Sequence, residues 1–351
     1  MDLHPQSGKM TRTKTRFMFG LIFAYVAISY MTGHLTPRPT LMRSLKNGNQ
    51  ETQLSSEWRS FLTHLETIRA LLRFDEFTDA HLKNEDDEAR RLESEVRVLC
   101  WIMTSPKNLD SRATAVRRTW ARRCNKLLFI SSVTNETFPT IGIELPEGRD
   151  HLTGKTIKAF KYIYEHHIDD ADWFMKADDD TYVILENLRY FLSGQNSNEP
   201  IFFGHHFKTI VKQGYFSGGA GYVLSKEALR RFGAKGNDET ICRQDGGAED
   251  AEFGKCMETL GVKVGNSTDK LGRNRFHCFD PDTHLMGGYP DWYYQYDANG
   301  AKKGRDSISD YTISFHYVTP EKMNALEFYI YHLRPYGLKS GKQELNQDWG
   351  S

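Results

Sequence analysis

The stretch WFMKADDDTYVI, residues 173–184, decides the fold. Its aromatic and apolar part, 173–177, is typical of a buried strand, and the three carboxylates that follow indicate a charged turn. Ligand sites in open α/β sheets lie beyond the carboxyl ends of strands. Adjacent carboxylates repel one another unless a cation or solvent compensates, and their hard oxygens suit Mg²⁺, Ca²⁺ or Mn²⁺. The stretch therefore predicts an α/β fold with one of two features: a divalent-metal site that holds a diphosphate, or a solvated acidic turn.

The composition and the N-terminal residues indicate the class of protein and its cellular compartment. The 351 residues carry a formal net charge of zero, so the chain has no electrostatic footprint for nucleic acid. Residues 1–16 are basic and residues 17–35 are mostly apolar, which predicts a cytoplasmic tail, an uncleaved signal anchor and a lumenal remainder. A span this short suits the thin membranes of the early secretory pathway.

Two further features agree with a lumenal location. N-glycosylation sequons begin at Asn135 and Asn266. Five cysteines in an oxidising lumen predict two disulfides and one free thiol. Sequence leaves the connectivity open, and the pairs nearest in the chain are Cys100 with Cys124 and Cys242 with Cys256.

The organisation of the chain follows from its periodicity. We expect a stem at residues 36–92, whose apolar residues from Trp58 to Leu72 recur at helical spacing and predict a packing or dimer face. A globular domain is expected at 93–337, followed by a tail at 338–351.

Within the globular domain, strands and helices alternate. A strand, a helix and a strand expected at 96–104, 111–123 and 127–132 indicate a parallel α/β unit. Further expected elements are helices at 152–167, 185–192 and 225–232, with Thr153 and Ser225 as N-caps, and a strand at 201–204.

Four other features could carry chemistry, and each has a structural alternative. The glycine-rich stretch 214–222 permits either close approach to a ligand or a tight bend between strands. Asp250, in the first turn of a helix, either serves as a general base or complements the helix dipole. The aromatic cluster 289–296 either stacks on sugars or belongs to the core. His316 lies in an apolar run, where a structural role is the commoner one.

Taken together and in order, these motifs resemble the core 1 β1,3-galactosyltransferases. The resemblance rests on the acid-tipped strand, on SGGAGY at 217–222, on the Glu-Asp helix start, and on FHY and HLRPYG at 315–317 and 332–337. It implies a GT-A fold, a Rossmann-like mixed sheet flanked by helices, in a type II Golgi membrane protein. It also implies inverting, Mn²⁺-dependent transfer of galactose from UDP-galactose to GalNAc α-linked to Ser or Thr of glycoproteins, which forms the core 1 O-glycan.

The resemblance also implies roles for single residues. Asp178 to Asp180 match the metal motif, with Asp180 and His316 as the most direct ligands, and Asp250 matches the catalytic base. Residues that match donor-binding segments are Met103, Arg149, Asp150, Lys155, Asp179, Gly218 and Gly219, and candidates for contact with the acceptor are Trp292 and Tyr317.

One stretch departs from the family's pattern. Family members carry adjacent cysteines shortly before the Phe-His-Tyr motif, whereas residues 305–310 of this chain read RDSISD. Two other functions therefore stay open: a weak or inactive paralogue that acts as a chaperone or binding protein for a related transferase, and a β1,3-transferase for another sugar. The intact acidic motif at 178–180 favours catalysis over the chaperone function.

Overall fold

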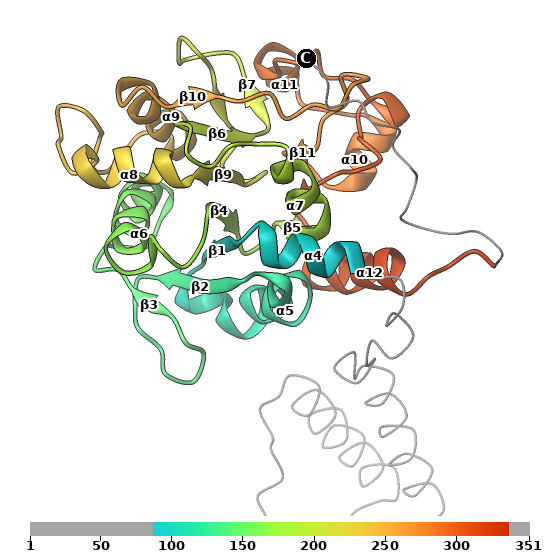
Figure 1. Cartoon of the computed structure of the whole chain (residues 1–351), viewed down its shortest axis with the longest axis horizontal. Coiled ribbons are helices and arrows are strands. Elements are labelled where there is room, and N and C mark those ends of the chain that lie inside the picture. Colours follow the sequence, from blue (N-terminus) through green and yellow to red (C-terminus); the bar gives the residue numbers. More distant parts are fainter. Residues whose placement is uncertain (1–86, 337–351) are drawn as a thin grey trace, which may run out of the picture. The chain divides into compact units, whose positions relative to one another are not determined.

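The computed structural model describes residues 87–336 (Figure 1). The expected cytoplasmic tail, membrane anchor and most of the stem, and the tail after residue 337, lie outside the described residues. Within 87–336, no helix has the length and apolar character that a membrane crossing needs. Helix α4 (Asp87–Glu95) begins the described part, and its Leu92 is buried in the core.

A seven-stranded mixed sheet lies at the centre, in the order β10-β6-β9-β4-β1-β2-β3. Strand β1 is parallel to its neighbours β2 and β4, whereas β9 is antiparallel to β4 and β6. The strands of this sheet are β1 (Val98–Met103), β2 (Lys126–Ser131), β3 (Ile141–Gly142), β4 (Trp173–Asp178), β6 (Ile201–Gly204), β9 (Tyr222–Ser225) and β10 (Lys263–Val264). The first half of the stretch WFMKADDDTYVI thus forms the middle strand, β4, and its second half contains the acidic turn and β5 (Tyr182–Val183).

Side chains of the middle strands alternate between two hydrophobic cores. In β1, Val98, Cys100 and Ile102 enter one core, and the residues between them enter the other. Because both faces are covered by helices, the strand is an uninterrupted apolar run. In Figure 1, α6 and α8 lie on the left of the sheet and α4, α7 and α12 on the right.

The helices largely follow the expected ranges. They are α5 (Thr114–Arg118), α6 (Leu152–His167), α7 (Leu185–Ser193), α8 (Lys226–Lys235), α9 (Glu249–Thr259), α10 (Pro281–Met286), α11 (Asp291–Tyr296) and α12 (Pro320–Tyr331). The Ser225 side chain accepts a hydrogen bond from the N–H of Ala228, so this predicted N-cap is confirmed. The predicted N-cap Thr153 is wrong, since α6 begins at Leu152 and Thr153 is buried within its first turn.

The single helix expected at 111–123 is also wrong. The segment breaks into a π-helical turn (Leu109–Ala113), α5 and a 3-10 turn (Trp120–Arg123). The break falls at Thr119, whose backbone leaves the helical region because the buried Trp120 turns inward and donates from Nε1 to the carbonyl of Thr181. Packing against the middle of the fold therefore overrides helix propensity here.

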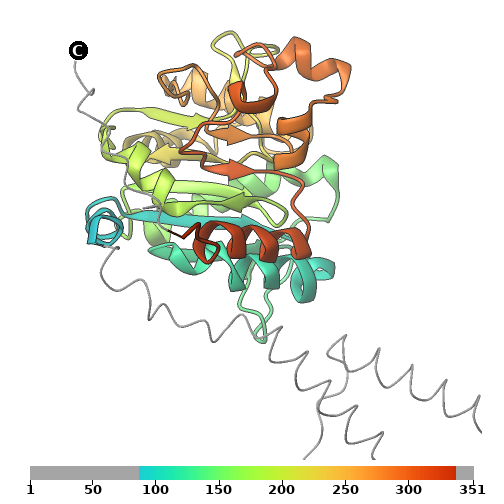
Figure 2. The same cartoon turned by 90° about the vertical axis from the view of Figure 1, so that its right-hand side faces the viewer.

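Two small sheets complete the fold. One has the order β11-β12-β5 and joins β11 (Phe276–His277), β12 (Ser314–Phe315) and β5 (Tyr182–Val183). The other pairs β7 (His206–Phe207) with β8 (Tyr215–Phe216). Figure 2 shows β12, in red, above helix α12.

Both sequence-local cysteine pairs form disulfides. Cys100 is bonded to Cys124, and Cys242 is bonded to Cys256. Cys278 is free and buried.

Candidate metal and active site

Two distant parts of the chain meet at the end of β4. Asp180 lies in the turn between β4 and β5, and His316 directly follows β12. Strands β5 and β12 pair antiparallel, with Phe315 opposite Tyr182. His316, which follows β12, therefore lies beside the residues that precede β5, and Asp180 is one of these. The N–H of Val318 donates to the carbonyl of Asp180 at 2.9 Å and closes this arrangement.

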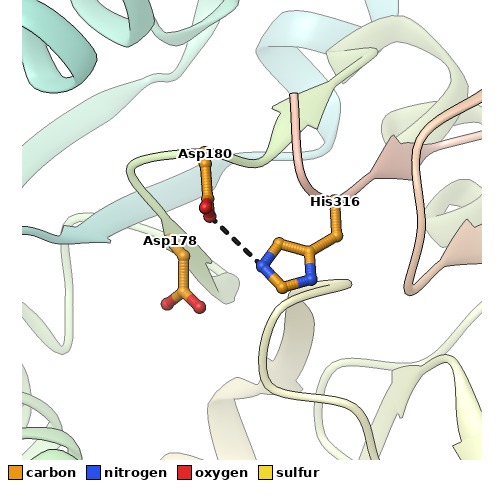
Figure 3. Close-up of side chains that lie close together, drawn as sticks. All are labelled: Asp178, Asp180 and His316. Carbon is orange, nitrogen blue, oxygen red and sulfur yellow. Dashed lines mark ion pairs between the residues drawn. The ribbon is translucent and has the colours of Figure 1, made fainter. Parts of the chain in front are cut away.

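The arrangement brings three candidate metal ligands together (Figure 3). Nε2 of His316 lies 3.2 Å from Oδ1 of Asp180. One ligand atom each from Asp178, Asp180 and His316 lies within 4.8 Å of the others. Nδ1 of His316 lies 3.3 Å from the carbonyl oxygen of Cys278. Because a carbonyl only accepts, Nδ1 carries a proton in that contact, so Nε2, which faces Asp180, is the ring nitrogen that could bind a cation.

The electrostatics of Asp180 fit a cation site. Burial raises the pKa of Asp180, but the contact with His316 and the charge of Arg112 outweigh burial, so the pKa lies below its ordinary value. The carboxylate is therefore ionised at neutral pH, as a metal ligand must be. Two carboxylates and an imidazole within one ion's reach fit a divalent cation.

Asp179, between these ligands, has a different role. Its Oδ2 accepts hydrogen bonds from Thr104 Oγ1 at 2.7 Å and Asn108 Nδ2 at 2.9 Å, so its carboxylate is turned toward the end of β1. Burial raises the pKa of Asp179. Arg112 lies 3.5 Å from Asp179 and 3.1 Å from Asp180, and offsets part of the repulsion among the carboxylates.

The glycine-rich stretch lies between the candidate metal ligand His316 and Asp250. A Cβ on Gly219 would lie 2.0 Å from Cε1 of His316, and a Cβ on Gly218 would lie 2.4 Å from Oε2 of Glu249. The N–H of Gly218 donates to Oδ2 of Asp250 at 3.2 Å. Both glycines are thus required by close packing, and they form the wall between His316 and Asp250.

Asp250 has the environment of a candidate base. It lies in the first turn of α9, and its Oδ1 accepts from the N–H of Ala251 at 2.9 Å. Burial raises the pKa of Asp250, and the backbone donors Gly218 and Ala251 offset only part of that shift. A carboxylate with a raised pKa is a better proton acceptor than an ordinary one.

A buried lysine lies beneath these groups. Lys176 belongs to β4, two residues before Asp178 and therefore on the same face of the sheet. Its Nζ lies 2.6 Å from Oδ1 of Asp178, 3.7 Å from Oε2 of Glu249, and donates to the carbonyl of Gly218 at 2.9 Å. Burial lowers the pKa of Lys176, but the charges of Asp178 and Glu249 raise it by more, so the side chain is a cation.

Two of the predicted donor-binding residues, Met103 and Lys155, lie at the end of β1. Met103 ends β1 opposite Asp178, and its carbonyl accepts from the N–H of Asp179. Nζ of Lys155 donates to the carbonyl of Thr104 at 3.1 Å and to Glu147. The remaining two, Arg149 and Asp150, are exposed in the short turn before α6.

The predicted acceptor residues belong to one aromatic group. Tyr317 is 55% exposed and stacks on His316, with ring centroids 3.9 Å apart. Trp292 is 43% exposed, and both Trp292 and Tyr317 contact the ring of Phe279. Tyr317 has a φ of 55°, a strained value for a non-glycine residue, and such strain is commonly found at functional sites.

Residues 305–310, which carry no cysteine pair, are fixed by hydrogen bonds. Ser307 Oγ lies 3.1 Å from Nδ1 of the buried His284. Asn274 donates from its N–H to the carbonyl of Ser307 and accepts at its carbonyl from the N–H of Ser309, both at 3.0 Å. The segment before β12 is therefore anchored by hydrogen bonds, without the adjacent cysteines that family members carry there.

The sequence reasoning missed two residues of the site. The sequence does indicate a role for Lys176, because a charged residue inside an otherwise apolar strand needs a buried partner. The sequence gives no such indication for Arg112, since it is one of several arginines in a basic segment.

The chain is also similar to known proteins. Residues 94–329 match the family model described as Fringe-like, and the chain belongs to this family. It is 47% identical over 261 residues to glycoprotein-N-acetylgalactosamine 3-beta-galactosyltransferase 1 of Xenopus laevis, which covers 73% of this chain and 72% of that protein.

Other known proteins are less similar to this chain. The chain is 28% identical over 169 residues to the beta-1,3-glucosyltransferase of Mus musculus, which covers 47% of this chain and 34% of that protein. A crystal structure of the galactosyltransferase LgtC with donor and acceptor sugar analogs matches 68% of this chain and 98% of its own, at 12% identity. Its TM-score is 0.36, too low to carry an argument.

Proposed function

We propose that this protein is an inverting β1,3-galactosyltransferase. It transfers galactose from UDP-galactose to the 3-hydroxyl of GalNAc α-linked to Ser or Thr of glycoproteins, which forms the core 1 O-glycan. The proposal is carried by the 47% identity to the Xenopus laevis enzyme across 73% of the chain. It is also supported by the cluster of Asp178, Asp180 and His316, because an acidic turn without function would not need a histidine beside its carboxylates.

The cation that we propose is Mn²⁺. Carboxylate oxygens suit Mg²⁺, Ca²⁺ and Mn²⁺, whereas imidazole nitrogen suits transition metals, so the mixed set of donors fits Mn²⁺ best. The residues that would hold it are Asp178, Asp180 and His316. When bound, the cation would supply positive charge that stabilises the departing diphosphate.

The chain's own groups provide the rest of the mechanism. The acceptor hydroxyl is a weak nucleophile at neutral pH, and Asp250 removes its proton as the oxygen attacks the anomeric carbon. The C–O bond to the galactose forms as the bond to the UDP oxygen breaks, and UDP leaves with that electron pair. Attack from the face opposite UDP inverts the anomeric centre. Gly218 and Gly219 allow the donor sugar to approach the backbone, and Trp292 and Tyr317 offer aromatic faces to the acceptor sugar.

The decisive experiment uses the purified full chain with Mn²⁺, a GalNAc-peptide, and UDP-galactose, UDP-GlcNAc or UDP-glucose in parallel. We expect transfer from UDP-galactose alone, with a β1,3 linkage in the product. Transfer from another donor would instead assign a different sugar. Binding of UDP without any transfer would favour the non-catalytic paralogue that acts as a chaperone or binding protein.

We also propose that the protein is a single-pass type II Golgi membrane protein with a lumenal catalytic domain. The basic residues 1–16 before the apolar residues 17–35 support this orientation. Protease protection of the domain in sealed vesicles tests it. The apolar stripe from Trp58 to Leu72 supports a homodimer, which the molar mass of the full chain in detergent would test.

A further inference from the structure

Lys176 has partners from three different parts of the site. It contacts Asp178 at the end of its own strand, the carbonyl of Gly218 in the glycine-rich turn, and Glu249 at the start of α9. The residue is 1% exposed, so none of these contacts is shared with bulk solvent.

These contacts continue toward the candidate base. Gly218, whose carbonyl accepts from Lys176, donates its N–H to Asp250. Gly218 therefore connects Lys176, which contacts the proposed metal ligand Asp178, to Asp250, the proposed base. Within residues 87–336, Lys176 is the only side chain that forms an ion pair with the Asp178 carboxylate.

Stability alone is a weak reason for this buried charge. Replacement of a buried ion pair by apolar groups is often neutral or stabilising, because desolvation costs as much as the attraction returns. Glu249 has other partners for its Oε1, the hydroxyls of Thr156 at 2.7 Å and Tyr222 at 2.9 Å. Lys176 is thus not the only partner of Glu249, although it is the one that faces Oε2.

We propose that Lys176 is a positioning residue, which fixes the Asp178 carboxylate and the Gly218 turn relative to each other so that the metal ligands and Asp250 face one substrate. This inference takes its substrate from the proposed function. Its test measures Mn²⁺ affinity and does not require that function to be correct. Groups that orient metal ligands typically contribute about 10- to 100-fold in metal affinity or activity.

The test must separate orientation from charge. Lys176→Met with Glu249→Gln removes one positive and one negative charge, so the net charge of the site is unchanged. The glutamine keeps an Oε1 that accepts from Thr156 and Tyr222. Weaker metal binding in this double variant therefore reports on lost orientation. Lys255→Met is the matched control, because Lys255 is on the same helix as Glu249 but exposed, with an ion pair to Glu252.

The measurement is the Mn²⁺ affinity of the full chain, from the free-Mn²⁺ signal in electron paramagnetic resonance, with thermal unfolding as the check of folding. We expect about 10- to 100-fold weaker binding in the double variant, wild-type binding in Lys255→Met, and unfolding temperatures close to that of the wild type in both. Wild-type Mn²⁺ affinity in a folded double variant overturns the proposal.

A second variant serves if the double variant does not fold. In Lys176→Met alone, loss of a cation would by itself strengthen the attraction of the site for Mn²⁺. Weaker binding there supports lost orientation, and equal or tighter binding overturns the proposal. If the wild type binds Mn²⁺ but transfers no galactose, the proposed function fails while the comparison of affinities still tests Lys176.

Discussion

Gly219 lies directly against the imidazole ring of His316, so close that a single added methyl group would lie 2.0 Å from Cε1. Gly219→Ala should therefore push His316 away from Asp180. Because this disturbs a metal ligand through its neighbour, we expect Mn²⁺ binding to weaken by at least about tenfold. Gly288→Ala is the control for the contact: its φ of 86° strains an alanine, a backbone strain that Gly219 does not have, but its Cβ would meet nothing within 4 Å. Equal Mn²⁺ affinities in the two variants would contradict the placement of His316.

Asp250→Asn should remove the proton acceptor and leave the metal ligands in place. General-base catalysis typically contributes about 10²- to 10⁴-fold, so we expect kcat to fall by that factor while the affinity for UDP with Mn²⁺ stays near the wild-type value. Kinetics with a GalNAc-peptide and calorimetry with UDP measure the two quantities. An equal loss of nucleotide binding would show that Asp250 belongs to the donor site instead.

The rate should depend on pH through Asp250. Burial raises the pKa of Asp250 above its ordinary value of about 3.9. Because the base acts only when deprotonated, the rate should fall as the pH is lowered through this raised pKa, and so at a higher pH than an exposed aspartate would give. The pH profile of kcat at saturating Mn²⁺ and UDP-galactose checks this. A profile that stays flat down to pH 4 would exclude Asp250 as the base.

The buried pair of His205 and Asp297 should stabilise the scaffold behind the site. Nε2 of His205 lies 3.1 Å from Oδ1 of Asp297, and both side chains are fully buried. Removing one partner of a buried pair typically costs about 3–5 kcal/mol, so Asp297→Asn should lower the free energy of unfolding by about that amount. Denaturant unfolding at pH 6 measures it, and a loss below about 1 kcal/mol would contradict the pairing.

The same pair predicts the pH range of this stabilisation. Burial lowers the pKa of His205, but Cys278 and Asp297 raise it well above 6.5, and His205 keeps the pKa of Asp297 below its ordinary value despite burial. The stabilisation from His205 is complete below about pH 6.5 and is lost as the pH rises through its folded pKa. That from Asp297 is lost as the pH falls through its lowered pKa. The difference in unfolding free energy between wild type and Asp297→Asn should therefore be greatest in mildly acidic solution.

Sequence predicted the parts of the fold that local pattern determines. The helix at 152–167 and the strand at 201–204 have the predicted bounds, because apolar periodicity and glycine mark their ends. The middle strand ends one residue later than predicted, at Asp178. The helix at 111–123 failed, because Trp120 gains more from burial in the core than the segment gains from a continuous helix.

The site was only partly predictable for a related reason. Motif order suggested that Asp180 and His316 act together, but β5 and β12, the strands that bring them together, are two residues each and carry no periodic signal. The links through Lys176 and Gly218 depend on which face of β4 meets α9, and sequence spacing alone does not determine that packing.

The pairing of β5 with β12 has a consequence for biosynthesis. The three aspartates at 178–180 are synthesised long before His316, the imidazole that lies opposite them. A chain truncated before residue 314 would keep its acidic turn and have nothing across from it. The proposed metal site can therefore assemble only after the ribosome has made β12 and His316.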